Sequence, residues 1–74
     1  MQYWLYAFKE YHGNLLIAKC DTLEQAKIER DRLDKQEYEY ADIVEMIWGK
    51  EPRLVSSESF EYYKNKTLVK RRIK

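Results

Sequence analysis

Residues 21–35 (DTLEQAKIERDRLDK) form the segment that most constrains the fold of this chain. They begin with two overlapping helix-start signals. Asp21 is followed by Glu24 three residues later, and Thr22 is followed by Gln25 at the same spacing. Each pair matches a capping box, in which the first side chain accepts from the first-turn amides and the second reaches back. The segment therefore predicts a helix that begins at Asp21 or Thr22.

This helix has one narrow apolar side. On a helical wheel its apolar residues fall together between the stems of two cations, and the remaining side is charged. The residues of the stripe and its flanks are Leu23, Ala26, Leu33, Lys27 and Arg30. Such a helix buries its stripe against another element. We expect the aromatic-rich segments before and after it to supply that surface.

Residues 3–11 (YWLYAFKEY) and 15–20 (LLIAKC) are predicted to form a β-hairpin. The turn falls at His12-Gly13-Asn14, because Gly and Asn accept the positive φ of tight hairpins. The first segment is apolar on both faces, one with Trp4, Tyr6 and Phe8 and the other with Tyr3, Leu5 and Ala7. This pattern indicates a central strand, or a strand whose second face is covered by something else.

Residues 38–48 (YEYADIVEMIW) are predicted to form a third strand, because Tyr, Ile, Val and Trp favour strands. A helix continuing from residue 21 is the alternative, since Leu33, Tyr40, Val44 and Ile47 also match a helical spacing. No Gly or Pro lies between Asn14 and Trp48 to interrupt such a helix.

The segment 49–53 (GKEPR) is a clear loop signal, and the chain after it alternates in a strand-like pattern. Residues 54–63 are predicted as a strand, although Ser56 or Ser57 equally suits a short-helix cap. A turn at 64–66 and a strand over 67–73 would complete a C-terminal hairpin. The sequence thus predicts one α+β domain over residues 1–74, a small antiparallel sheet with one amphipathic helix packed on one face.

Composition restricts the class of protein further. Hydrophobic residues make up 45% of the chain, which predicts a folded rather than a disordered domain. One cysteine cannot form an intramolecular disulfide, which favours a reducing compartment. No apolar run approaches the ~20 residues that span a bilayer, and the first residues lack the features of a signal peptide. We expect a soluble, cytoplasmic protein without a membrane partner.

Charge is unevenly distributed along the chain. Residues 1–63 hold eight Lys/Arg and all thirteen Asp/Glu, whereas residues 64–74 hold six Lys/Arg and no acid. In this basic C-terminal segment, cations that bind phosphates follow two rings that can stack on bases. The alternative function is therefore nucleic-acid binding through Tyr62, Tyr63, Lys64, Lys66, Lys70, Arg71 and Arg72.

Catalytic and metal sites are not indicated. His12 and Cys20 are the only imidazole and thiol, too few for a zinc site. His12 is expected in a solvent-facing turn and Cys20 as a small buried apolar residue. A reactive Cys–His pair would need the hairpin register to bring them together. No phosphate-binding or dinucleotide motif is present. We predict a protein that is not an enzyme and has no cofactor and no small-molecule substrate.

Eleven aromatic rings are more than one small sheet face can hide. Tyr and Trp are typical anchors of protein interfaces, so we predict protein binding, or homodimer formation, through exposed rings chosen from Tyr3, Tyr11, Tyr38 and Trp48. The predicted function is a small adaptor, or an inhibitor of a host factor. In length and in its Lys/Glu/Tyr/Ile-rich composition the chain resembles small accessory proteins of phages and mobile elements. That resemblance assigns no role to any residue.

Overall fold

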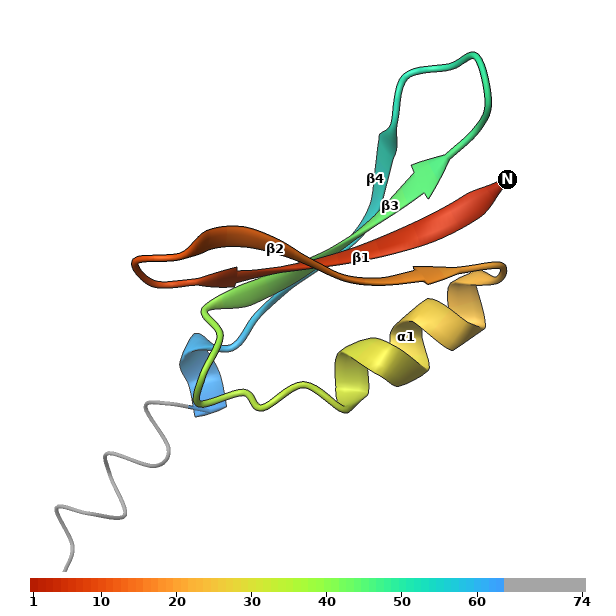
Figure 1. Ribbon diagram of the computed structural model, residues 1–74. Helices are drawn as coiled ribbons and strands as arrows, with labels where there is room; N and C mark the ends of the chain where they lie inside the picture. Colours follow the sequence, from red (N-terminus) through yellow and green to blue (C-terminus); the bar gives the residue numbers. More distant parts are fainter. Residues whose placement is uncertain (64–74) are drawn as a thin grey trace, which may run out of the picture.

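The computed structural model describes residues 1–63. Its elements are β1 (Gln2–Lys9), β2 (Gly13–Cys20), α1 (Leu23–Asp31), β3 (Tyr40–Met46) and β4 (Arg53–Ser59). The four strands form an antiparallel sheet in the order β2-β1-β3-β4, and α1 lies against one side of it (Figure 1). The predicted α+β class, with a hairpin, a helix and then a third strand, is confirmed.

The core lies between α1 and the sheet. Strand side chains alternate between the two faces, so Leu5 and Ala7 of β1 point to the same side. Both are fully buried, as is Ala26 of the helix. Residues paired with them across β1 and β3 complete the layer. The buried apolar residues are Leu5, Ala7, Cys20, Ala26, Ala41, Ile43 and Phe60.

The helix begins at the second of the two capping signals. Thr22 is the N-cap, and its Oγ1 accepts from the backbone N–H of Gln25 at 3.1 Å. The helical residues end at Asp31, earlier than the polar stretch to residue 35 suggested. Beyond the helix, Leu33 still packs against the core from the connecting segment. Ala26 is the buried residue of α1, and its small side chain lets the helix approach the sheet closely.

A basic side chain ties the helix to the distant edge strand. Arg30 of α1 donates from Nη1 to Ser56 Oγ at 3.0 Å, and its Nε lies 3.4 Å from a carboxylate oxygen of Glu58. Both partners belong to β4, which comes late in the chain. This contact connects α1 to the strand farthest from β2.

The first hairpin turns two residues earlier than predicted. The N–H of His12 donates to the carbonyl of Lys9 at 2.9 Å, and Gly13 already belongs to β2. Tyr11 therefore occupies the left-handed region, with φ of 69°, while Gly13 has φ of 78°. The predicted turn at residues 12–14 is wrong because the strand register, and not glycine alone, sets the turn position.

Residues 40–46 form a strand, so the alternative of a continuous helix from residue 21 is wrong. The predicted loop at residues 49–53 is confirmed in its first part, where Gly49 has φ of 79°. β4 is the last strand of the described residues and pairs with β3, ending at Ser59 rather than at residue 63. Residues 61–63 are helical. The predicted turn at 64–66 and strand at 67–73 lie outside the described residues.

Candidate functional site

The sheet face opposite α1 carries four of the five aromatic residues of the strands. In β1 it presents Trp4, Tyr6 and Phe8, which alternate with the buried Leu5 and Ala7. The strand registers assign the neighbours of these rings on the other three strands. We call this surface the open face. Its members are Gln2, Trp4, Tyr6, Phe8, Asn14, Leu16, Lys19, Tyr40, Asp42, Val44, Met46, Leu54, Ser57 and Ser59.

The rings of the open face are held by contacts with one another. Phe8 and Tyr40 stack with centroids 5.1 Å apart and planes inclined by 3°, across β1 and β3. The ring centroids of Trp4 and Tyr6 are 6.4 Å apart, and the ring planes are inclined by 48°. These rings are half-buried, whereas Leu16 and Leu54 at the flanks are 45% and 58% exposed. The result is an ordered apolar surface rather than a set of freely moving side chains.

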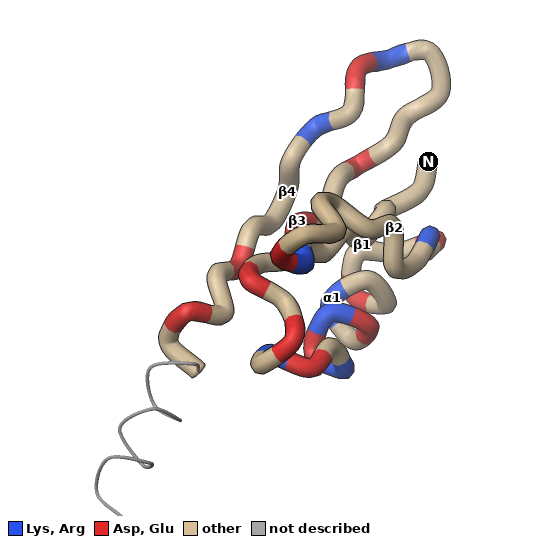
Figure 2. The backbone as a smooth tube through the Cα atoms, turned by 60° about the vertical axis from the view of Figure 1, so that its left-hand side comes forward, with Lys and Arg blue, Asp and Glu red and all other residues tan. Residues whose placement is uncertain are grey.

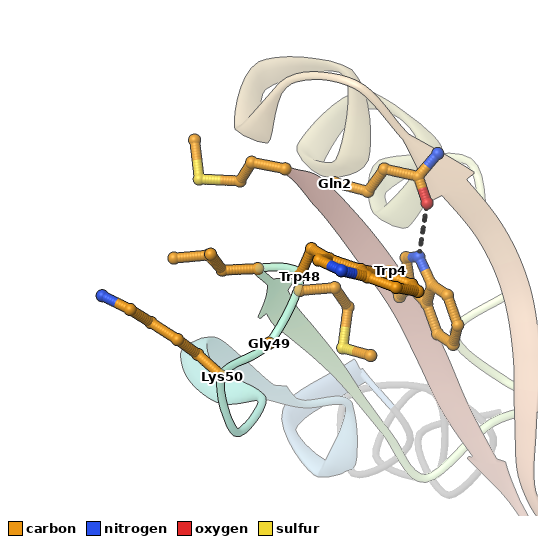
Figure 3. A pocket seen from close by; sticks show the side chains of 8 residues that line it. Gln2, Trp4, Trp48, Gly49 and Lys50 are labelled. Carbon is orange, nitrogen blue, oxygen red and sulfur yellow. Dashed lines mark hydrogen bonds between the residues drawn. The ribbon is translucent and has the colours of Figure 1, made fainter.

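A cleft of about 490 Å³ continues the open face at one end (Figure 3). Trp4 forms part of its wall, and the indole Nε1 donates to Gln2 Oε1 at 3.0 Å. Trp48 reaches it from the loop between β3 and β4 and is 99% exposed. The lining residues are Met1, Gln2, Trp4, Met46, Ile47, Trp48, Gly49 and Lys50. Met side chains adapt to irregular partners, so this cleft is suited to an apolar side chain.

Two opposite charges lie among the apolar residues of the open face. The Nζ of Lys19 sits 4.4 Å from the ring centroid of Trp4, a cation–π contact that fixes the ammonium over the face. Asp42 accepts from the hydroxyl of Ser57 at 2.7 Å. Elsewhere in residues 1–63, many charged residues lie on α1 and the segment that follows it (Figure 2). The open face is apolar at its centre with little net charge.

The four rings predicted for protein binding do not form one surface. Tyr11 is 94% exposed at the β1–β2 turn, and Trp48 lies in the β3–β4 loop at the other end of the sheet (Figure 1). Tyr3 and Tyr38 pack against the core on the side of α1. The hydroxyl of Tyr3 also donates to Glu45 Oε2 at 3.3 Å. Of the four, only Trp48 adjoins the open face.

Sequence reasoning did not select Trp4, Tyr6, Phe8 and Tyr40 as binding residues. The signal was present, because residues 3–8 are apolar on both strand faces. That pattern shows that a second apolar surface exists. It does not tell which of the two faces the helix covers, and this depends on the sheet register and the position of Ala26.

The predicted nucleic-acid segment is only partly within the described residues. Tyr62 and Tyr63 are 67% and 39% exposed, and their rings meet edge to face at 5.6 Å. The Nζ of Lys35 lies 5.5 Å from the ring centroid of Tyr63. The basic residues of this prediction, Lys64, Lys66, Lys70, Arg71 and Arg72, lie outside the described residues.

Cys20 and His12 sit at opposite ends of β2. His12 is exposed in the turn, and Cys20 pairs with Tyr3 at the far end of the strand. The alternative of a reactive Cys–His pair is therefore wrong. Burial raises the pKa of the Cys20 thiol, and the nearby carboxylates of Glu29 and Asp21 raise it further. Cys20 is the small buried side chain that the sequence predicted, with a thiol kept neutral.

Residues 1–63 contain no group of three or more His, Cys, Asp or Glu side chains placed to hold a metal ion. Within the same residues, no helix has the length and apolar character that crossing a membrane requires. Comparison of the chain with protein-family models, curated proteins and solved structures gave no significant match.

Proposed function

We propose that this chain is a non-enzymatic binding protein whose open face docks another protein. The carrying observation is the ordered aromatic surface built by Trp4, Tyr6, Phe8 and Tyr40 on the side of the sheet that lacks α1. Aromatic anchors at the centre of a surface, with polar residues at its rim, are the usual composition of a protein interface.

The adjoining cleft strengthens this proposal. Its walls combine the indoles of Trp4 and Trp48 with the side chains of Met1 and Met46. A partner that lies along the open face would reach this cleft with one apolar side chain. In that role, the protein acts as an adaptor, or as an inhibitor that covers a surface of a host factor, and the cytoplasm is its proposed location.

Nucleic-acid binding is less well supported within the described residues. Lys19 is the cation among the open-face residues, and Asp42 places a carboxylate two strands away. Affinity for a phosphate backbone depends on several cations acting together. Stacking rings without such a row of cations favour an apolar protein partner.

The test is selection of peptides on the immobilised full-length protein. A displayed random-peptide library is enriched on the wild type, with counter-selection on Tyr6→Arg, and the enriched peptides are titrated against both. Lys27→Glu, which changes an exposed charge on α1, is the matched control. We expect peptides that bind the wild type and the control alike and lose at least tenfold affinity for Tyr6→Arg, about 1.4 kcal/mol.

Two results would contradict the proposal. One is a set of enriched peptides that bind Tyr6→Arg as well as the wild type. The other is an absence of enriched peptides together with tight, steeply salt-dependent binding of fluorescent single-stranded DNA or RNA in anisotropy titrations. The second result would indicate that the protein binds nucleic acid rather than another protein.

A further inference from the structure

We propose that the occupant of the open face is a second copy of this chain, in a two-fold homodimer that packs open face on open face. This inference rests on the proposed function, since it takes the open face to be a protein-binding surface and names the partner. Three properties of the face carry it: the arrangement of its charges, the position of its aromatic row, and its size.

The charges of the open face are arranged to complement themselves. Lys19 lies on β2 opposite Trp4, and Asp42 lies on β3 opposite Tyr6, so the two charges flank β1 on its two sides. A two-fold axis along β1 lays β2 of one copy over β3 of the other. Lys19 then lies over the strand that carries Asp42 of the second copy, two residues or about 7 Å away along it, and its long side chain spans this offset. The symmetry repeats this pair.

Within one copy these two charges are not paired with each other. The ammonium of Lys19 rests over Trp4, and Asp42 holds the hydroxyl of Ser57. β1 lies between their strands. Each charge therefore keeps its position over the face by contacts with uncharged groups, and each retains its capacity for an ion pair. A single charge of either sign would repel its own copy across this axis, whereas the observed pair attracts it.

The aromatic row coincides with the same axis. Trp4, Tyr6 and Phe8 all lie on β1, so the axis packs this row against its own copy at the centre of the interface. The flanking positions on β2 and β3 add Leu16, Tyr40 and Val44. Polar residues lie at the margin, at Asn14, Ser57 and Ser59. Two sheets pack face to face about 10 Å apart with strands crossing at about 30°, which an axis inclined by about 15° to β1 produces.

The size of the open face indicates a dimer of moderate strength. Strands spaced by about 4.8 Å and rising about 3.3 Å per residue give a four-stranded face of roughly 19 by 24 Å. Side-chain relief and the adjoining cleft bring it near the lower limit of a standard interface, about 600 Å² on each partner. We expect a dissociation constant in the micromolar range.

The experiment is sedimentation velocity of the full-length protein over a concentration series, with two single charge reversals. In Lys19→Glu, the two contacts across the axis become acid against acid. In Asp42→Lys, they become cation against cation. We expect each variant alone to dimerise at least tenfold more weakly than the wild type.

Mixing the two variants gives the decisive measurement. In the mixed dimer, Glu at position 19 faces Lys at position 42, and Asp42 faces Lys19, so both contacts are attractive again. We expect the mixture, with one variant fluorescently labelled, to recover dimer affinity to within about threefold of the wild type. Recovery also demonstrates that both variants are folded. Lys27→Glu, outside the face, is expected to dimerise as the wild type does.

Two outcomes would overturn the homodimer. A wild type that remains monomeric at the highest concentration would remove the second copy as the occupant, while peptide binding to the open face would still uphold the proposed function. A wild type that dimerises, with both charge reversals dimerising equally well and mixing having no effect, would place the interface elsewhere on the chain.

Discussion

The rings of Phe8 and Tyr40 lie parallel, 5.1 Å apart, on the side of the sheet that α1 does not cover. They are directly paired residues of β1 and β3. A stacked pair on that side orders the surface before any partner arrives, which lowers the entropic cost of binding. The stack thus links the stability of the sheet to the quality of the binding surface.

The first prediction concerns this stack. Phe8→Ala, Tyr40→Ala and the double variant form a double-mutant cycle, with unfolding by urea measured at low protein concentration. We expect a coupling of about 0.5–1 kcal/mol, since paired aromatic residues across strands contribute that much beyond burial. Trp4→Ala combined with Tyr40→Ala supplies the comparison, because those two residues are not paired across β1 and β3. Equal coupling in both cycles would show that the stack makes no specific contribution.

The second prediction distinguishes the two possible helix caps. Thr22 accepts the N–H of Gln25, whereas Asp21 precedes it. We expect Thr22→Ala to lower the free energy of unfolding by about 1 kcal/mol, the usual value of an N-cap hydrogen bond. Asp21→Ala should cost less than half of that, through its charge near the helix start alone. The reverse order in thermal or urea unfolding would assign the cap to Asp21.

The third prediction concerns the backbone of Tyr11. Its φ of 69° lies in the left-handed region, where side chains with a Cβ are disfavoured, and its side chain is 94% exposed. Tyr11→Gly therefore relieves strain and loses little contact area. We expect a gain in stability of about 0.5–1 kcal/mol. Glu10→Gly is the control, because residue 10 has no positive φ and should lose stability instead. A loss of stability in Tyr11→Gly would show that the ring has contacts of its own.

The fourth prediction is a pH dependence that comes from Cys20. Burial, with the carboxylates of Glu29 and Asp21, raises the thiol pKa above its ordinary 9.0. The folded chain holds this proton more tightly than the unfolded chain does. The contribution of the thiol to stability is complete below pH 9.0 and is lost as the pH rises through the folded-state pKa.

The measurement is urea unfolding of the wild type and Cys20→Ala at pH about 7.5 and about 10. We expect the wild type to lose more stability than the variant between the two conditions. The two proteins differ in this one side chain, so the difference between their losses reports the thiol. Equal losses in the two proteins would mean that Cys20 is not protected in the folded state.

The elements that carry local signals were predictable from the sequence. The helix start was limited to Asp21 or Thr22 by side-chain chemistry, and residues 38–48 were assigned to a strand by their β-branched and aromatic content. The turn of the first hairpin was misplaced. Its position follows from the pairing of Lys9 with Gly13, a property of the register that Gly13 alone does not determine.

The position of the binding surface depends on which face of the sheet the helix covers. Tyr3 and Trp4 are adjacent and chemically similar, yet one packs on the core and the other lies on the open face. Side chains of β1 alternate between two faces of the sheet. The packing of Leu5 and Ala7 under Ala26 determines which of these faces the helix covers. That choice depends on residues from separate elements, so the residue pattern of a single segment does not predict it. The same limit applies to Tyr38, predicted for an interface and found against the core.

The most direct test of the account is hydroxyl-radical footprinting of the wild-type protein at low and high concentration. Trp4, Tyr6 and Met46 report on the open face, and the exposed Tyr11 at the far turn is the internal control. If a second copy covers the open face, oxidation of the three reporters slows at high concentration, while Tyr11 reacts at an unchanged rate. If the oxidation rate of each of the four residues is the same at low and at high concentration, the open face is not the surface that a second copy covers.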